Sequence, residues 1–206
     1  MTARGSSTGD ASTGHASTGH ASTGHASTGR SGDAALPRPA ATEYADYYRD
    51  YIAAVPDGDV VAHLRQRAVA TPALFEQLGE ERGGFRYAPG KWSVREVLGH
   101  VVDGERLFAH RALAVARRDP GDQPSMDQDL WMAAADFDRR TLASLCAEYR
   151  AVRGATLALF SSFDAEVGAR TGRANGKLFT VRSLVWIVAG HEMHHLRVLR
   201  ERYGIG

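Results

Sequence analysis

The sequence has little cysteine and no long apolar segment. Cys146 is the only cysteine among the 206 residues, so the chain cannot form an internal disulfide. This composition suits a reducing compartment, and we expect a cytoplasmic protein in which Cys146 is a small core residue. No apolar run approaches the length that a membrane span requires, so we expect no membrane partner.

Beyond its first residues the chain also lacks a net charge. It contains 25 basic and 24 acidic residues, and the first 39 residues carry three arginines and two aspartates. The remainder therefore has 22 residues of each sign. A neutral domain offers no electrostatic footprint for a nucleic acid, so we expect a small-molecule substrate and no nucleic-acid partner.

The N-terminal segment lacks apolar periodicity. It contains the unit Ala-Ser-Thr-Gly-His three times between Ala11 and His25, and a fourth copy ends in Arg30. Because such a segment cannot bury enough apolar surface to fold, we predict a disordered tail over residues 1–39 and one domain over residues 40–206. The tail has no apolar core segment, so we do not expect it to be a secretory signal. Its histidines would bind metal only weakly, and a repeat tolerated at a free terminus is the simpler interpretation.

Every long segment of the predicted domain shows helical spacing of its apolar residues. Ser93 followed by Glu96 is a capping box, Thr180 caps the last helix, and Pro72 predicts a kink or break. Residues 168–177 contain turn signals and indicate a loop or small hairpin. The sequence therefore predicts an all-α four-helix bundle. The expected helices cover residues 42–54, 59–79, 93–118, 138–163 and 180 to about 202, with a short piece at 130–135.

The most informative motif is His191-Glu192-Met193-His194-His195, near the C-terminus. His191 and His195 lie one helical turn apart, in the middle of an apolar stripe, and His194 lies on its flank. Two polar rings in such a place need partners, and a shared divalent metal is the simplest one. A pair of hydrogen-bonded core histidines is the alternative. The stripe consists of Leu184, Ile187, Val188, Val198 and Leu199.

The same letters spell H-E-x-x-H, in which Glu192 would be the general base of a zinc protease. Such a protease needs a third ligand further along the chain. Only eleven residues follow His195, and Glu201 lies off the ligand face of the helix. Glu192 lies off that face too, so we do not expect it to act as a base. A third ligand must come from upstream.

The best upstream ligand is His100, at the inner edge of the apolar stripe of helix 93–118. Gly104, one turn later, leaves room beside the imidazole, and Asp103 is a candidate for orienting it through a hydrogen bond. A core histidine bonded to Asp103 or to a backbone carbonyl is the alternative. Arg111, on the same inward face, would meet an acidic substrate or form a structural ion pair. Three neutral histidines with an open position are the pattern of a catalytic metal site.

Two blocks of the sequence resemble the DinB/YfiT-like superfamily. The resemblance covers about residues 42–203, and it implies a four-helix bundle, frequent homodimers and a divalent ion, zinc or nickel among others. The implied metal ligands are His100, His191 and His195. The blocks are Gly90-Lys91-Trp92-Ser93 with His100, Asp103, Glu105 and Arg106, and Gly190-His191 with His194-His195.

The resemblance also implies an activity. Members are often described as metal-dependent hydrolases or damage-inducible proteins, and better understood relatives use mycothiol or bacillithiol in transfer or isomerase reactions. We therefore predict a metal-dependent enzyme whose three-histidine site activates a low-molecular-weight thiol for transfer to a small electrophile. A hydrolase with a metal-bound hydroxide and a non-catalytic, stress-induced metal-binding protein are the alternatives. The sequence assigns no catalytic or thiol-binding side chain.

Overall fold

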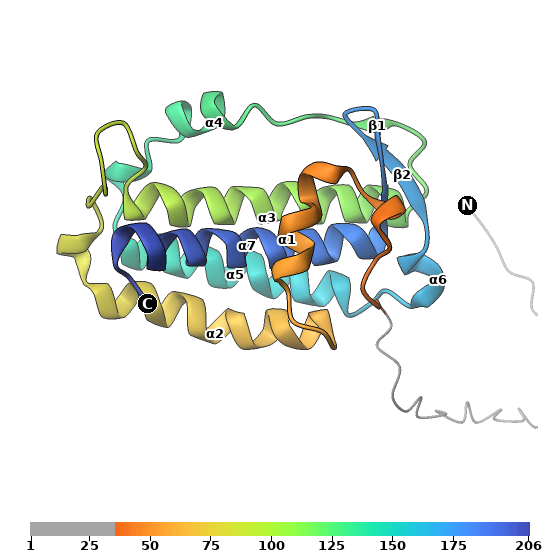
Figure 1. Ribbon diagram of the computed structural model, residues 1–206, viewed down its shortest axis with the longest axis horizontal. Helices are drawn as coiled ribbons and strands as arrows, with labels where there is room; N and C mark the ends of the chain where they lie inside the picture. The colour runs from red at the N-terminus through yellow and green to blue at the C-terminus, as the bar shows by residue number, and fades with distance from the viewer. Residues whose placement is uncertain (1–35) are drawn as a thin grey trace, which may run out of the picture. The chain divides into compact units, whose positions relative to one another are not determined.

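The computed structural model describes residues 36–206, and the N-terminal repeat with its predicted disorder lies outside these residues. Four long helices run side by side (Figure 1), and they confirm the predicted four-helix bundle. Helix α3 packs against α7 and α5, and helix α2 packs against α5 and α7. The four helices are α2 (Val60–Leu78), α3 (Val94–Ala116), α5 (Leu142–Phe160) and α7 (Val181–Tyr203).

The helices begin where the capping residues indicate. The Ser93 hydroxyl accepts from the Glu96 backbone N–H at 3.1 Å, and the Glu96 carboxylate accepts from the Ser93 N–H at 2.6 Å. Thr180 caps α7 in the same manner. Helix α2 continues through Pro72, so a break there is ruled out; the ring is buried, and its packing offsets the backbone hydrogen bond that proline cannot make.

Helix α5 is shorter than predicted. It begins at Leu142, capped by Thr141, because Phe137–Arg139 form a separate 3₁₀ turn. The residue before that turn, Asp136, has a φ of 49°, which interrupts any helix running through it. Two shorter helices separate the long ones along the chain: α4 (Gln128–Ala135) follows α3, and α6 (Ala165–Gly168) follows α5.

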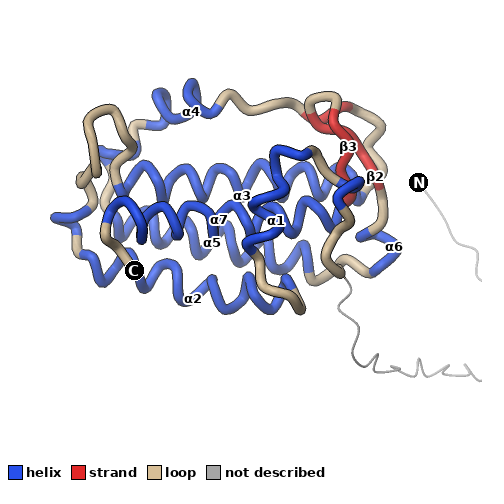
Figure 2. The backbone as a smooth tube through the Cα atoms, viewed as in Figure 1, coloured by secondary structure: helices blue, strands red, loops and turns tan. Residues whose placement is uncertain are grey.

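The predicted hairpin is present as strands β2 (Thr171–Ala174) and β3 (Lys177–Thr180), which pair antiparallel. Asn175 and Gly176 form its turn with φ values of 50° and 69°, the left-handed conformation that a two-residue hairpin turn requires. A further strand, β1 (Asp122–Gln123), pairs parallel with β2. This small sheet, drawn in red in Figure 2, joins the α3–α4 connection to the hairpin.

The N-terminal segment of the domain crosses the bundle. Helix α1 (Arg49–Ala54) follows two 3₁₀ turns, Ala41–Glu43 and Asp46–Tyr48, and packs against α7. The approach is close at Gly190, where an added Cβ would lie 2.1 Å from the Tyr51 carbonyl oxygen. A glycine at this position therefore lets α1 lie directly on α7.

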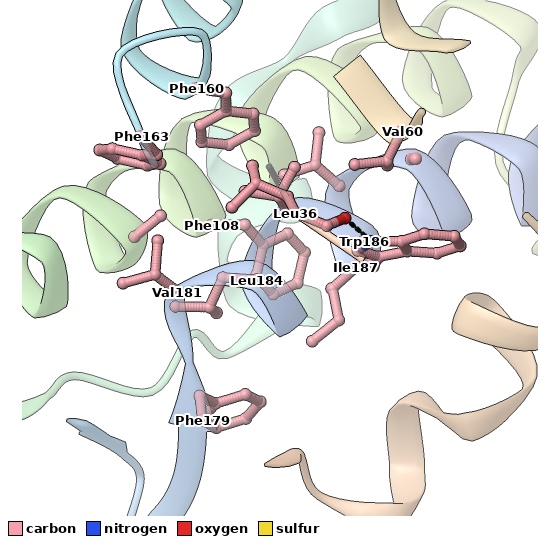
Figure 3. Packing of buried hydrophobic residues seen from close by; sticks show 14 of the residues in the cluster. Leu36, Val60, Phe108, Phe160, Phe163, Phe179, Val181, Leu184, Trp186 and Ile187 are labelled. Carbon is pink, nitrogen blue, oxygen red and sulfur yellow. Dashed lines mark hydrogen bonds between the residues drawn. The ribbon is translucent and has the colours of Figure 1, made fainter. Parts of the chain in front are cut away.

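The chain enters the bundle core earlier than the sequence indicates. Leu36 is 2% exposed, and its carbonyl accepts a hydrogen bond from the Trp186 indole N–H at 3.0 Å (Figure 3). The Arg38 guanidinium lies 4.4 Å from the Trp186 ring and donates to the Ile52 and Val55 carbonyls. Leu36 and Pro39, assigned to the tail from sequence, are therefore buried in the bundle, whereas Pro37 and Arg38 are exposed. A single leucine creates no periodicity that would reveal this.

None of the helices within residues 36–206 is long and apolar enough to cross a membrane.

Candidate metal centre

The structure brings the three predicted histidines together. His100 comes from α3, and His191 and His195 come from the facing side of α7. The Nε2 atom of His191 lies 2.9 Å from that of His100 and 3.1 Å from that of His195. Ligand atoms of all three rings lie within 4.8 Å of one another.

Glycine at position 104 creates the space for this arrangement. A Cβ added to Gly104 would lie 2.6 Å from Cε1 and 3.0 Å from Nδ1 of His191. From its position in the sequence, Gly104 is expected to leave room for the imidazole of its own helix, that of His100. The structure shows that the room is used by the histidine of the neighbouring helix.

Burial keeps the three imidazoles neutral. Desolvation lowers the pKa of His100 to about 4, and the neighbouring His194 adds to the effect. Desolvation and the adjacent imidazoles hold the pKa of His191 and of His195 well below the usual value. At neutral pH each ring therefore keeps a nitrogen lone pair.

Aromatic side chains enclose the histidines. The Trp92 ring lies 4.7 Å from the His100 ring and stacks on His195 at 6.2 Å. Tyr51 and Phe108 each lie 5.7 Å from the His191 ring, edge to face. These apolar surfaces limit access of water to the nitrogen cluster.

The geometry suits a shared cation better than hydrogen bonds alone. The Nε2 atom of a neutral imidazole carries either one hydrogen or one lone pair, so His191 cannot form good hydrogen bonds to both neighbours at once. One divalent ion would accept a lone pair from each ring. Three histidines leave a position open in the tetrahedral geometry common for zinc.

Glu192 points away from this cluster into a buried ionic network. Its carboxylate accepts from the Arg153 guanidinium at 2.8 Å, from the Tyr149 hydroxyl at 2.7 Å and from the Thr71 hydroxyl at 2.5 Å. Arg153 also donates to Glu105, at 2.7 Å for the shortest contact. Although burial opposes ionisation, Arg153 and the two hydroxyls hold the pKa of Glu192 below its usual value. The structure therefore places the glutamate of the H-E-x-x-H pattern in a structural role.

Two other residues singled out from sequence lie beside the cluster without joining it. Asp103 forms an ion pair with Arg106 at 3.2 Å, and no hydrogen bond links it to a histidine within the described part of the chain. The His194 ring lies 5.0 Å from the Tyr51 ring, tilted by 49°, and contacts Arg197. Its side chain lies on the flank of α7, as the sequence indicates.

A cavity of about 320 Å³ opens beside His100 and His191. Helix α3 forms one wall and α7 contributes His191. The other walls are segments that the sequence does not connect with the site: the first turns of the domain, the α3–α4 connection and the hairpin. Tyrosines spaced at three and four before the first long helix were the one visible signal. No Asp or Glu is among the lining residues: Ala45, Tyr47, Tyr48, Tyr51, His100, Leu107, Phe108, Arg111, Ser125, Met126, Gln128, Ala174, Asn175, Lys177, Phe179 and His191.

Helical bundles that carry convergent ligand side chains on the inward faces of neighbouring helices are a recurrent class of metal-site proteins, and this chain has that architecture. Within this class it belongs to the DinB superfamily, whose family model matches residues 63–199. Among solved structures, YfiT from Bacillus subtilis is similar, with a TM-score of 0.53 and 20% sequence identity over 82% of this chain and 94% of YfiT. YfiT is described as "a probable metal-dependent hydrolase with an unusual four-helix bundle topology". The comparison with curated proteins found no match.

Proposed function

We propose that this protein is a metal-dependent enzyme that activates a low-molecular-weight thiol for transfer to a small electrophile. The observation that supports the proposal is the convergence of the three Nε2 atoms of His100, His191 and His195 beside a cavity without a carboxylate. Three neutral ligands leave a divalent ion its full charge, which lowers the pKa of a thiol or of water bound to it.

The protein side chains have three roles: metal binding, hydrogen-bond donation and exclusion of water. The three histidines stay neutral because burial lowers their pKa, so they hold the ion without competition from protons near neutrality. Burial raises the pKa of Tyr48 and of Tyr51 on the cavity wall, so both hydroxyls remain protonated donors. Apolar side chains such as Phe108 and Phe179 exclude water from the space in which the electrophile would lie.

The absent carboxylate favours a thiol over water. Hydrolysis usually requires a positioned base or acid, often a glutamate, to move protons between water and the leaving group. The cavity lining has no carboxylate, and the nearest one along α7, Glu192, is held in the buried network. A thiol bound to the ion would release its single proton to solvent, and attack of the resulting thiolate on the electrophile would require no further base. A hydrolase is the second candidate, since the structural neighbour YfiT is described as one.

Metal content of purified full-length protein tests the ligand assignment. We expect one divalent ion, zinc or nickel, per chain by elemental analysis, and a sharp loss of it in His100→Ala, His191→Ala and His195→Ala. His194→Ala is the matched control, because this histidine lies on the same helix but outside the nitrogen cluster. Full occupancy in a double variant of His100 and His195 would refute the assignment.

Cobalt substitution separates the thiol from the hydrolase. Titration of the cobalt protein with mycothiol or bacillithiol should add an intense near-ultraviolet band if the sulfur binds the ion. The same thiols should then be consumed when model electrophiles are supplied. An unchanged cobalt spectrum together with no thiol consumption would refute the thiol proposal, and turnover of ester or amide substrates without thiol would support the hydrolase.

A further inference from the structure

We propose that the cavity beside the histidines binds a small organic acid, with its carboxylate on Arg111 and its reacting end toward His100 and His191. The proposal names a substrate class for the same site and in that respect rests on the proposed function. Its observations, however, concern the far side of the cavity and do not require a metal ion.

Arg111 is a buried cation without a carboxylate partner. It is 4% exposed, and within residues 36–206 its side chain bonds a backbone carbonyl and pairs with no acidic side chain. Its Nη2 donates to the Pro124 carbonyl at 2.6 Å, and its Nε is buried with no hydrogen-bond partner. A guanidinium has five N–H donors, and besides the Pro124 carbonyl the described residues offer Arg111 the neighbouring Tyr48 hydroxyl but no carboxylate. The structural ion pair considered from sequence is therefore not formed.

The other buried arginine of the described chain shows what a structural role requires. Arg153 is fully buried and binds Glu105, Glu192 and the Leu64 carbonyl. A buried charge without such partners is costly, and one lining a cavity is best explained by a ligand that supplies the missing negative charge. Arg111 lines the cavity, whereas Arg153 does not.

The charges around the cavity favour an anion. Arg111 and the exposed Lys177 are its two cationic side chains, and no carboxylate balances them within the lining. The guanidinium also lies beside Tyr48 and opposes the effect of burial on the pKa of that hydroxyl. Ser125, Gln128 and Asn175 also line the cavity with polar side chains.

The distance between the two ends fits a small molecule. The Arg111 guanidinium carbon lies 5.7 Å from the Phe108 ring, and that ring lies 5.7 Å from the His191 ring. The guanidinium carbon therefore lies within twice 5.7 Å of the His191 ring. Phe108 is close to both groups, and Leu107, Met126 and Phe179 belong to the same lining, so the body of the ligand should be apolar.

Binding of carboxylates and their neutral amides tests the proposal. The probes are benzoate, phenylacetate and hexanoate, each with its amide, and phenyl phosphate. Dissociation constants are measured by ligand-observed nuclear magnetic resonance with the full chain, both metal-loaded and after chelator treatment. We expect each carboxylate to bind at least tenfold more tightly than its amide. The preference should persist without metal, because Arg111 and not the ion provides it.

Variants assign the preference to one side chain. Arg111→Gln should abolish it, and Arg111→Lys should retain part of it because the charge is kept. Arg117→Gln is the matched control, since it removes the same charge from the exposed end of α3 outside the cavity. Binding of the amides shows that each variant still forms the cavity, which separates lost charge recognition from a loosened α3–α4 connection.

Several outcomes would overturn the inference. Carboxylates that bind Arg111→Gln as tightly as the parent protein, or that bind only the metal-loaded form, would show that Arg111 does not hold the anion. Phenyl phosphate binding far more tightly than benzoate would replace carboxylates by phosphate esters. A thiol response in the cobalt protein without any carboxylate preference would refute this inference alone and leave the proposed function intact.

Discussion

Replacing Gly104 by alanine tests the metal centre where α3 faces His191. In an exposed helix interior this change stabilises the fold, because alanine is favoured over glycine by about 1 kcal/mol. Here the new methyl carbon would lie 2.6 Å from Cε1 of His191, against ordinary contacts of 3.4–4 Å. Relief requires a displacement of about 1 Å, several times the ~0.2 Å tolerance of a metal–ligand distance.

We therefore expect Gly104→Ala to lose zinc affinity by about 10–100-fold, the size of effect seen when support for a ligand is removed. The stabilisation by alanine should also be absent, because the displaced imidazole offsets it. Zinc affinity is measured by competition with a chelator, and stability by thermal melts of the metal-free protein.

Gly154 provides the matched control. It lies in the interior of α5, exposed, and an added Cβ would meet no atom within 4 Å. Gly154→Ala should raise the melting temperature by about 2–4 °C, which corresponds to about 1 kcal/mol in a domain of this size. Its zinc affinity should be unchanged. If Gly104→Ala gains the same stability and keeps its affinity, His191 does not occupy the position that the structure gives it.

Three further predictions concern the fold around the site. Deleting residues 1–39 should destabilise the protein relative to deleting residues 1–34 by roughly 1.5–3 kcal/mol, because it removes the buried Leu36; equal melting temperatures would contradict this. In metal-free protein burial lowers the pKa of His100 to about 4, below its usual 6.5, so the unfolded chain takes up this proton first as the pH falls. The free energy of unfolding should therefore decrease between about pH 6.5 and about pH 4, and urea melts of His100→Phe should show a shallower decrease. Glu192→Ala should cost about 3–5 kcal/mol in urea melts while zinc content is retained, whereas removal of a catalytic base would leave the free energy of unfolding nearly unchanged and lower turnover instead.

The helices and the histidine cluster could be predicted because their signals are local. Ser93 and Glu96 stand three residues apart, and His191 and His195 stand four apart, so helical geometry alone fixes their relation. His100 followed from its place on an apolar helix face. In each of these cases the partner lies within one helical turn or on a face defined by periodicity.

The features that sequence did not reveal depend on distant partners. Glu192 became structural because Arg153, 39 positions earlier, reaches it across the core. Arg111 left two roles open, and only the tertiary neighbours show that no carboxylate pairs with it. Strand β1 has two residues, too few for an alternating pattern, and Leu36 is one apolar residue at the end of a polar segment. Such features depend on tertiary packing, which local sequence patterns do not reveal.

The cavity is lined partly by helices of the bundle and partly by the segments that connect them. The histidines stand on α3 and α7, whose facing surfaces are fixed by the bundle core, whereas Tyr48, Met126 and Asn175 lie on connecting segments. Substitutions in these connections can reshape what enters the cavity without moving the nitrogen cluster, since loops tolerate change far better than packed helices. The residues that line the cavity can thus change while the three histidines keep their relative positions, because the packing of the bundle holds α3 against α7.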